Sequence, residues 1–258
     1  MVISLSQVCA APWGAELLRE IDFSLERGQI LSIMGPNGAG KTSLLNLLCG
    51  SVLPTRGQFT LGDQPLTDWP IRERARAQAV LPQQSSLNFP YTVEEVVLLG
   101  RTPHASGTTI DAQILDETLQ ATDTSDLRHR IYTQLSGGEK QRVQLARVFA
   151  QLWRAQDSET RLLLLDEPTS ALDLSHQQLI MDSVRELARQ GCAIVLVLHD
   201  FNLAARHTDL CLVLDGGRQR ALGTPAQVLT PELFRQVFGV EVSVQEHPAG
   251  NFPLVIQS

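Results

Sequence analysis

Residues 35–42, GPNGAGKT, carry glycines, a lysine and a threonine in the spacing G-x-x-x-x-G-K-[ST]. The apolar stretch before them, residues 29–34, predicts a strand, and residues 41–49 after them have helical spacing. Glycines let a backbone curl around a phosphate chain, and a helix start adds partial positive charge. A Gly-rich turn with a chance lysine is the alternative. The pattern predicts a nucleotide-phosphate site made of Gly35, Pro36, Asn37, Gly38, Ala39, Gly40, Lys41, Thr42 and Ser43.

A second candidate group lies where an apolar run ends in two carboxylates. Residues 162–165 are four leucines, and Asp166 and Glu167 follow them directly. Strand ends in open α/β sheets border the ligand crevice. Asp166 is therefore a candidate ligand of Mg²⁺, and Glu167 a candidate general base for an attacking water. Charges also commonly end strands, so this signal depends on the groups that accompany it.

A third group is the run LSGGEKQR, residues 135–142. Ser136 is a typical residue at a helix start, and Gly137 and Gly138 permit close approach of an anion. The run therefore predicts a second phosphate-binding helix N-terminus. The alternative is a capping box of Ser136 with Glu139, which needs no ligand.

Together these motifs, in this order, resemble the ABC-transporter ATPases, whose signature is LSGGQ or a close variant; here Glu139 replaces the glutamine. The resemblance covers residues 3–230. It implies ATP and Mg²⁺ as cofactors and a head-to-tail homodimer that sandwiches two nucleotides. In that arrangement Ser136, Gly137 and Gly138 contact the γ-phosphate of the ATP held by the other copy.

The resemblance also assigns roles to isolated residues. Gln83, or its neighbour Gln84, corresponds to the glutamine that contacts Mg²⁺ and senses the membrane partner. Asp173 belongs to the loop that communicates across the dimer, and His199 corresponds to the switch histidine near the γ-phosphate. Trp13 is the candidate for stacking on adenine, with ordinary aromatic packing as the alternative. The implied catalytic residues are Glu167, His199, Gln83 and Lys41, and the implied Mg²⁺ ligands are Thr42, Gln83 and Asp166.

The elements that must position these residues predict an α/β fold, with a P-loop NTPase (RecA-like) core, an antiparallel β portion and an inserted helical subdomain. Buried parallel strands are predicted at 162–166 and 193–199, and an edge strand at the N-terminus. Helices are predicted at 111–120, 139–152 and 175–190, and a hairpin at 210–222. Thr92 and Glu95 predict a capping box for a helix that Gly100 ends. We expect residues 1–87 and 158–224 to form the core, 88–157 the helical subdomain, and 225–258 a helical and extended tail with two Pro-led helices.

Composition narrows the class of protein. The chain has 258 residues and a net charge of −7, which disfavours a nucleic-acid partner. Its apolar runs are shorter than the roughly 18–20 residues that span a bilayer, and residues 1–14 lack the features of a signal peptide. The four cysteines have no C-x-x-C spacing, which favours buried thiols. The resemblance implies a peripheral protein on the cytoplasmic face of a bacterial inner membrane, with two transmembrane permease subunits and, indirectly, a periplasmic substrate-binding protein.

Finer details are similar to the ATPases of bacterial haem importers, within the iron-chelate and vitamin B12 importer branch. They are residues 79–83 (AVLPQ), 88–101, the polar insertion between Trp153 and Arg161, 172–177 (LDLSHQ) and 199–205. This resemblance implies haem as the cargo, with ferric siderophores or vitamin B12 as alternatives. A soluble ABC ATPase without a transport role is less favoured, because this chain carries one cassette and no coiled-coil heptads. An ordinary P-loop kinase does not explain the LSGGE run or His199.

Overall fold

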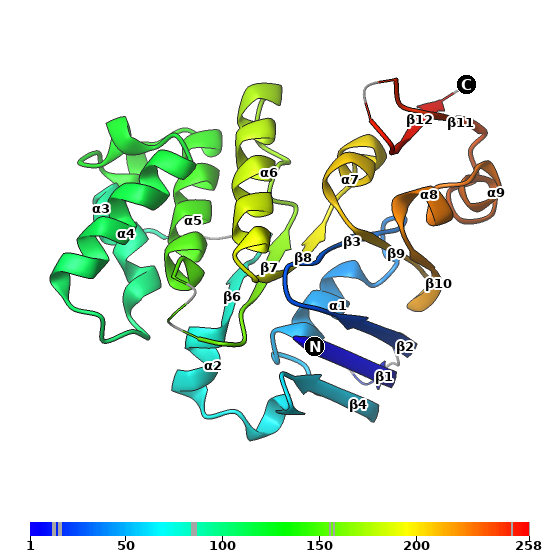
Figure 1. The fold of residues 1–258 in the computed structure, drawn as a ribbon, viewed down its shortest axis with the longest axis horizontal. Helices are drawn as coiled ribbons and strands as arrows, with labels where there is room; N and C mark the ends of the chain where they lie inside the picture. The colour runs from blue at the N-terminus through cyan, green and yellow to red at the C-terminus, as the bar shows by residue number, and fades with distance from the viewer. Residues whose placement is uncertain are drawn as a thin grey trace. The chain divides into compact units, whose positions relative to one another are not determined.

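The computed structural model describes residues 1–11, 14, 17–83, 87–154, 156, 158–248 and 250–257 (Figure 1). The chain forms two compact units: Met1–Asp68 together with Ala193–Ser258, and Trp69–Cys192. The chain therefore passes through the first unit twice, before and after the second.

The first unit is built on a mixed sheet with the strand order β5-β4-β1-β2-β10-β9-β3-β8. Strand β3 runs parallel to both β8 and β9, whereas β1 is antiparallel to β2 and β4. The antiparallel portion and the parallel portion of the predicted α/β fold are thus both present in this unit. The strands are β1 (Ile3–Ala10), β2 (Leu18–Leu25), β3 (Ile30–Met34), β4 (Arg56–Leu61), β5 (Gln64–Pro65), β8 (Ala193–Val197), β9 (Leu210–Asp215) and β10 (Arg218–Gly223).

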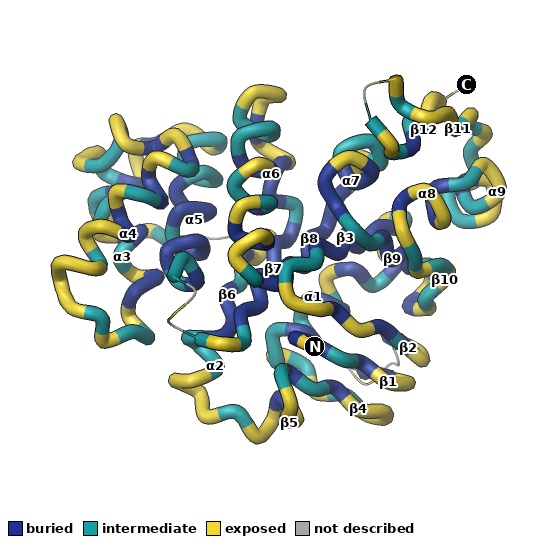
Figure 2. Tube along the Cα trace, in the orientation of Figure 1, coloured by how far each residue is buried: buried dark blue, intermediate teal, exposed yellow. Residues whose placement is uncertain are grey.

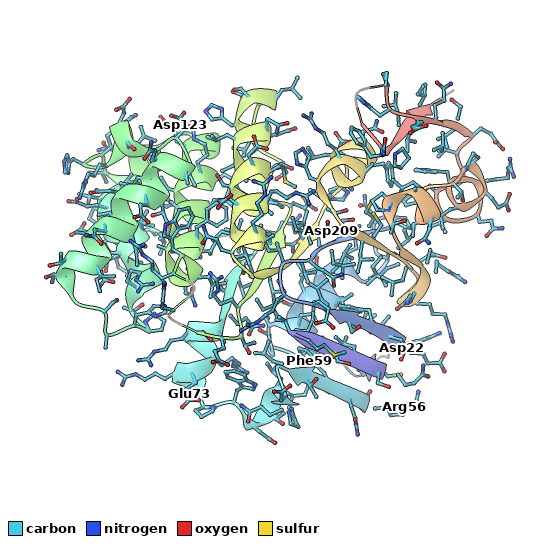
Figure 3. The ribbon with its side chains drawn as sticks, viewed as in Figure 1. Asp22, Arg56, Phe59, Glu73, Asp123 and Asp209 are labelled. Atoms are coloured by element: carbon cyan, nitrogen blue, oxygen red, sulfur yellow. The ribbon has the colours of Figure 1, made fainter. Side chains whose placement is uncertain are left out.

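The central strands of this unit are apolar along their whole length. Every residue of β3 and β8 is buried (Figure 2), as expected for parallel strands covered on both faces. Asp209, labelled in Figure 3, accepts the N–H of Ile30 at 2.8 Å and so fixes where β3 begins relative to β9. The hairpin of β9 with β10 was predicted from the sequence and is confirmed.

The prediction of an N-terminal edge strand is wrong. Strand β1 pairs with β2 on one side and with β4 on the other. Residue Ile3 lies opposite Leu25 in one register and opposite Leu61 in the other. An interior strand of a mixed sheet can keep a partly polar face, so the alternation of β1 does not reveal how many neighbours it has.

Helices and a small second sheet complete the first unit. Helix α1 (Lys41–Leu48) buries four leucines, which confirms the predicted apolar face. The predicted tail helices also form, and each has a proline in its first turn. The antiparallel pair of β11 and β12 was not predicted. These later elements are α7 (Phe201–His207), α8 (Pro225–Val228), α9 (Pro231–Leu233), a π-helical turn (Phe234–Phe238), β11 (Val242–Glu246) and β12 (Pro253–Gln257).

The second unit is mainly helical and contains one pair of parallel strands, β6 and β7. Its elements are α2 (Ile71–Ala77), β6 (Gln78–Leu81), α3 (Val93–Leu98), α4 (Thr108–Ala121), α5 (Gly137–Leu152), β7 (Leu162–Asp166) and α6 (Leu174–Arg189). The helices predicted at 111–120, 139–152 and 175–190 correspond to α4, α5 and α6 and are confirmed.

Helices α3, α4 and α5 share one apolar core within this unit. The predicted capping box is present: the Glu95 N–H donates to the Thr92 hydroxyl at 3.4 Å, and the Thr92 N–H donates to the Glu95 carboxylate at 2.7 Å. Helix α3 ends at Leu98 and continues as a 3₁₀ turn that includes Gly100. A Cβ at Gly100 would lie 2.2 Å from the Arg147 carbonyl oxygen, so glycine is required by close packing on α5. The core comprises Val93, Val96, Val97, Ile114, Leu115, Leu119, Tyr132, Leu135, Val143, Ala146 and Ala150.

The cysteines are thiols, and three of them are buried. Burial raises the pKa of the Cys192 thiol to about 12, so this side chain acts as a small apolar residue. Among the described residues, the helices are all too short or too polar to cross a bilayer.

Candidate nucleotide-binding and hydrolysis site

The loop between β3 and α1 has a backbone that only glycine can adopt at two positions. Gly35 has φ 148°, and a Cβ there would lie 2.1 Å from the backbone oxygen of Leu214 on β9. Gly40 has φ 101° and is the N-cap of α1. Gly40 carries no side chain to cap the helix, so the first N–H groups of α1 are directed toward whatever the loop surrounds. This backbone fits a phosphate chain.

Lys41 is the first residue of α1 and is 8% exposed. Its ammonium donates to the carbonyl oxygens of Gly35 at 2.8 Å and Pro36 at 3.0 Å. The cation therefore lies over the loop, where an anion held by the backbone N–H groups would meet it. Thr42 is exposed and Ser43 is half-buried in the same helical turn, and Asn37, Gly38 and Ala39 complete the loop.

In the second unit, the predicted base and a predicted Mg²⁺ ligand meet. Gln83 follows β6, and its side-chain amide donates to the Glu167 carboxylate at 3.2 Å. Asp166 is the last residue of β7 and is 5% exposed, whereas Glu167, directly after it, is half-buried with φ 49°. Parallel pairing of β6 with β7 brings together two residues that are 84 positions apart.

Side chains from two helices brace the loop that follows Glu167. The Gln141 amide of α5 donates to the Pro168 carbonyl at 3.3 Å, and the Gln177 amide of α6 donates to the Leu172 carbonyl at 3.0 Å. A Cβ at Gly138 would lie 3.1 Å from the Ala171 carbonyl oxygen. Helix α5 thus carries the signature glycines and also holds the loop behind the carboxylates.

Ser136 is the N-cap of α5 and forms a complete capping box with Glu139. The Ser136 N–H donates to the Glu139 carboxylate at 2.7 Å, and the Glu139 N–H donates to the Ser136 hydroxyl at 3.4 Å. The Ser136 backbone N–H first, then the Ser136 hydroxyl and the charges of Arg130 and Arg142, lower the pKa of the Glu139 carboxyl. The capping-box alternative is therefore present in the structure. The box engages the N–H groups of Ser136 and Glu139, and a Cβ added at the exposed Gly137 between them would meet nothing within 4 Å.

Asp173 ends the same loop and is the N-cap of α6. Its carboxylate accepts the backbone N–H of His176 at 2.9 Å, the Ser175 hydroxyl at 2.8 Å and a ring nitrogen of His176 at 2.8 Å. These bonds, the backbone one above all, lower the pKa of Asp173 to about 2. The other ring nitrogen of His176 lies 3.2 Å from Asp123, which is labelled in Figure 3 beyond the end of α4.

His199 lies in the first unit, two residues beyond the end of β8, and is exposed. Asp200 directly after it is the N-cap of α7. Two predicted residues, Trp13 and Gln84, lie outside the described residues.

Sequence reasoning missed several contributors to the site. Leu214 shapes the loop through its backbone oxygen, and no side-chain pattern reports such a contact. Gln141 and Gln177 are ordinary polar positions of two helices until the loop between them is known. Arg130 pairs with Glu139, and only this contact could have been suspected from the sequence, because the two opposite charges lie nine positions apart.

The residues implied for Mg²⁺ are a hydroxyl, an amide and one carboxylate, a set typical of a cation that also binds phosphate oxygens. Within the described part of the chain, His, Cys, Asp and Glu form no cluster of three or more that could hold a metal.

The family model for ABC transporters matches residues 18–170. The chain is 53% identical to the hemin import ATP-binding protein HmuV of Pseudomonas entomophila, with 94% of each chain covered. It is 50% identical to the HmuV protein of Pseudomonas aeruginosa over the same shares.

Solved structures give the same picture at lower identity. An ABC transporter in an inward-facing conformation is 27% identical with a TM-score of 0.81, covering 100% of this chain and 97% of that one. A dimeric ATP-binding cassette in a post-hydrolysis state, bound to ADP and phosphate, is 26% identical with a TM-score of 0.75, covering 86% and 98%. The predicted P-loop NTPase fold is confirmed by these likenesses. With the Gly35–Gly40 loop, the paired Gln83 and Glu167, and the capped LSGGE helix, they establish that the chain belongs to the ABC transporter family.

Proposed function

We propose that this chain is the ATP-binding and ATP-hydrolysing subunit of a haem importer. In this proposal it acts as a homodimer on the cytoplasmic face of the bacterial inner membrane, bound to two permease subunits. A periplasmic binding protein delivers the cargo to the permease. The observation that carries the enzymatic part is the hydrogen bond from Gln83 to Glu167 beside the buried carboxylate of Asp166.

The loop before α1 would bind the triphosphate of ATP. Its N–H groups and the helix start attract the phosphates, and the Lys41 ammonium, held over the loop by the Gly35 and Pro36 carbonyls, would move onto the β- and γ-phosphate oxygens. Trp13 remains the candidate for stacking on adenine.

Hydrolysis needs a group that orients and deprotonates water. Glu167 would accept the proton while the water oxygen attacks the γ-phosphorus in line. The bond from the γ-phosphorus to the bridging oxygen would break, and ADP would leave with that oxygen. The amide of Gln83 donates to Glu167 and so holds the carboxylate in one orientation. His199 would contact the γ-phosphate.

For Mg²⁺, the first unit offers the Thr42 hydroxyl, and the second offers the Asp166 carboxylate and the amide oxygen of Gln83. The Gln83 nitrogen faces Glu167, so its oxygen is the atom left to bind a cation. The ion would offset the negative charge that develops on the phosphates.

The dimer would complete each site. Ser136, Gly137 and Gly138 of one copy would contact the γ-phosphate bound to the other copy, and Asp173 would lie in the loop between the two sites. Residues 88–157 would act as a helical subdomain that carries this signature. Gly137 supports the proposal because it is exposed, with open space where a side chain would be.

Two measurements test the proposal in order. Purified chain should hydrolyse Mg-ATP, and Glu167→Gln should abolish that activity. The chain should then drive ATP-dependent uptake of haem into proteoliposomes when it is copurified with its permease. Hydrolysis coupled to a ferric siderophore or vitamin B12 instead of haem would correct the cargo alone. No hydrolysis by the complete complex would overturn the enzymatic proposal.

A further inference from the structure

The end of the chain is attached to the segment that carries His199. The side-chain amide of Asn202, on α7, donates to the Val255 carbonyl at 3.0 Å and accepts the Val255 N–H at 2.8 Å. The nitrogen and the oxygen of the Asn202 amide therefore both form hydrogen bonds with one residue of β12, Val255. A planar amide held at both ends cannot rotate without breaking a bond, so this contact fixes the separation of α7 and β12. The same two elements pack side by side in Figure 1.

The residues between His199 and Asn202 are also held. Asp200 caps α7 by accepting the N–H groups of Asn202 at 2.8 Å and Leu203 at 3.0 Å. The ring of Phe201 packs edge-on against Phe234 and Phe238, with centroids 4.7 and 5.0 Å apart. Thus both Phe201 and Asn202 are fixed by residues of the last part of the chain.

A pocket of about 520 Å³ lies at this junction, and His199 is part of its lining. Two strands of the terminal pair contribute to the same lining through Val242 and Val255, and Phe238 contributes from the π-helical turn. The space beside the histidine is therefore bounded by the C-terminal segment. Val242 and Val255 of the terminal strands thus limit the space that is available to the His199 side chain.

We infer that the C-terminal pair of strands, β11 and β12, positions His199 for ATP hydrolysis and that Asn202 is the positioning residue that connects them. The inference rests on the proposed function in assigning His199 to the γ-phosphate. It adds a role for residues 242–257, to which the hydrolytic mechanism gives none.

Asn202→Ala tests the inference in the full-length chain. It removes both bonds to Val255, and kcat for ATP hydrolysis should fall about 5- to 10-fold. KM for ATP should change less than about 2-fold, because the loop at residues 35–43 binds the nucleotide. Arg206→Ala, at an exposed position of the same helix, is the matched control and should leave kcat unchanged.

A second variant reaches the same contact from the other side. In a strand, the N–H and the C=O of one residue point the same way, so at Val255 both face Asn202 and not β11. Val255→Pro therefore removes a bond to Asn202 without removing a ladder bond between the two strands, and should lower kcat in the same manner. Loss of kcat in one variant with no change in the other would overturn the connection through Asn202.

Histidine NMR separates this inference from the proposed function. The ring signal of His199, assigned through His199→Gln, should shift or broaden in Asn202→Ala, while the signals of the other histidines stay in place. This readout does not require hydrolysis, so it still decides the inference if the chain proves to lack ATPase activity. An unmoved His199 signal, or a rise in KM that parallels a lower melting temperature, would overturn the positioning role.

Discussion

Glu139 and Arg130 form an ion pair at the start of helix α5, with 3.2 Å between the carboxylate and guanidinium atoms. The second oxygen of the same carboxylate accepts the N–H of Ser136. Glutamate thus fills the capping role that a glutamine would fill, and adds a negative charge at the helix start that is proposed to meet a phosphate. Arg130 offsets that charge.

The pair predicts that the effect of Arg130 depends on Glu139. In a Glu167→Gln background, Arg130→Met should weaken ATP-driven dimerisation by about 2- to 5-fold, because the Glu139 carboxylate then faces the phosphate with only the Arg142 charge to offset it. Glu139→Gln should leave dimerisation equal or tighter, and the double variant should match Glu139→Gln alone. Sedimentation at several salt concentrations measures this. An equal loss of dimerisation from Arg130→Met with Glu139 present and with Glu139→Gln would contradict the prediction.

Glu167→Gln should lower kcat by about 100-fold or more, because the amide cannot accept the proton of the attacking water. The bond from Gln83 survives, since the new amide oxygen still accepts it. ATP affinity should therefore stay within a few-fold, and Mg-ATP should trap a dimer visible by size-exclusion chromatography. Gln83→Ala is the companion variant, with kcat reduced but measurable. Hydrolysis by Glu167→Gln within a few-fold of the original chain would remove Glu167 from the base role.

Ser136→Arg should abolish hydrolysis and leave ATP binding to the monomer intact. The large side chain blocks approach of the helix start to a phosphate on another copy, while residues 35–43 of the same copy are unaltered. Ser136→Ala is the matched control, because it loses the same N-cap bond without adding bulk. Both should show a similarly lowered melting temperature. Full ATPase activity in Ser136→Arg would place the whole site within one chain.

The pKa of Asp173, lowered to about 2 from 3.8, makes its contribution to stability depend on pH. A depressed pKa contributes stability above the unfolded-state value, and that contribution is lost as the pH falls from about 4 to about 2. The urea midpoint of the original chain should exceed that of Asp173→Asn near neutral pH, and the two should converge near pH 2. A difference that stays constant over this range would contradict the assigned hydrogen bonds.

Phe89 and Tyr91 are exposed aromatic residues on the segment between Gln83 and α3, with ring centroids 6.1 Å apart. We expect this pair to dock on a permease subunit, since exposed aromatic side chains are enriched at protein interfaces. The double alanine variant should lose copurification with the permease and retain ATP binding. Ile110→Ala, at an exposed apolar residue of α4, is the control and should keep the partner. Retained copurification in the double variant would exclude this surface.

The parts of the fold that the sequence predicted are those set by local pattern. The leucine face of α1, the capping box of Thr92 with Glu95 and the Pro-led helices of the tail all depend on residues within a few positions of one another. The neighbours of β1 depend on a partner strand about 50 residues away, and alternation within β1 carries no information on that distance.

In the candidate site, too, the local features were predictable and the contacts between distant residues were not. The loop at residues 35–42 and the Ser136 cap were predictable because each is one continuous motif. The bond from Gln83 to Glu167 and the bonds from Asn202 to Val255 join residues 84 and 53 positions apart. Such contacts are fixed by strand pairing and helix packing, which a motif does not encode.

The backbone at Glu167 gives this position a meaning beyond its carboxylate. Its φ of 49° lies in the left-handed region, where a residue with a Cβ is disfavoured by about 1 kcal/mol or more and where glycine or asparagine is most at ease. Gln7, Glu20 and Asp123 have similar φ values, so this conformation by itself does not identify a functional residue. In the proposed function, the chain places the carboxylate of the general base directly after the end of β7 in spite of a backbone conformation that disfavours glutamate there.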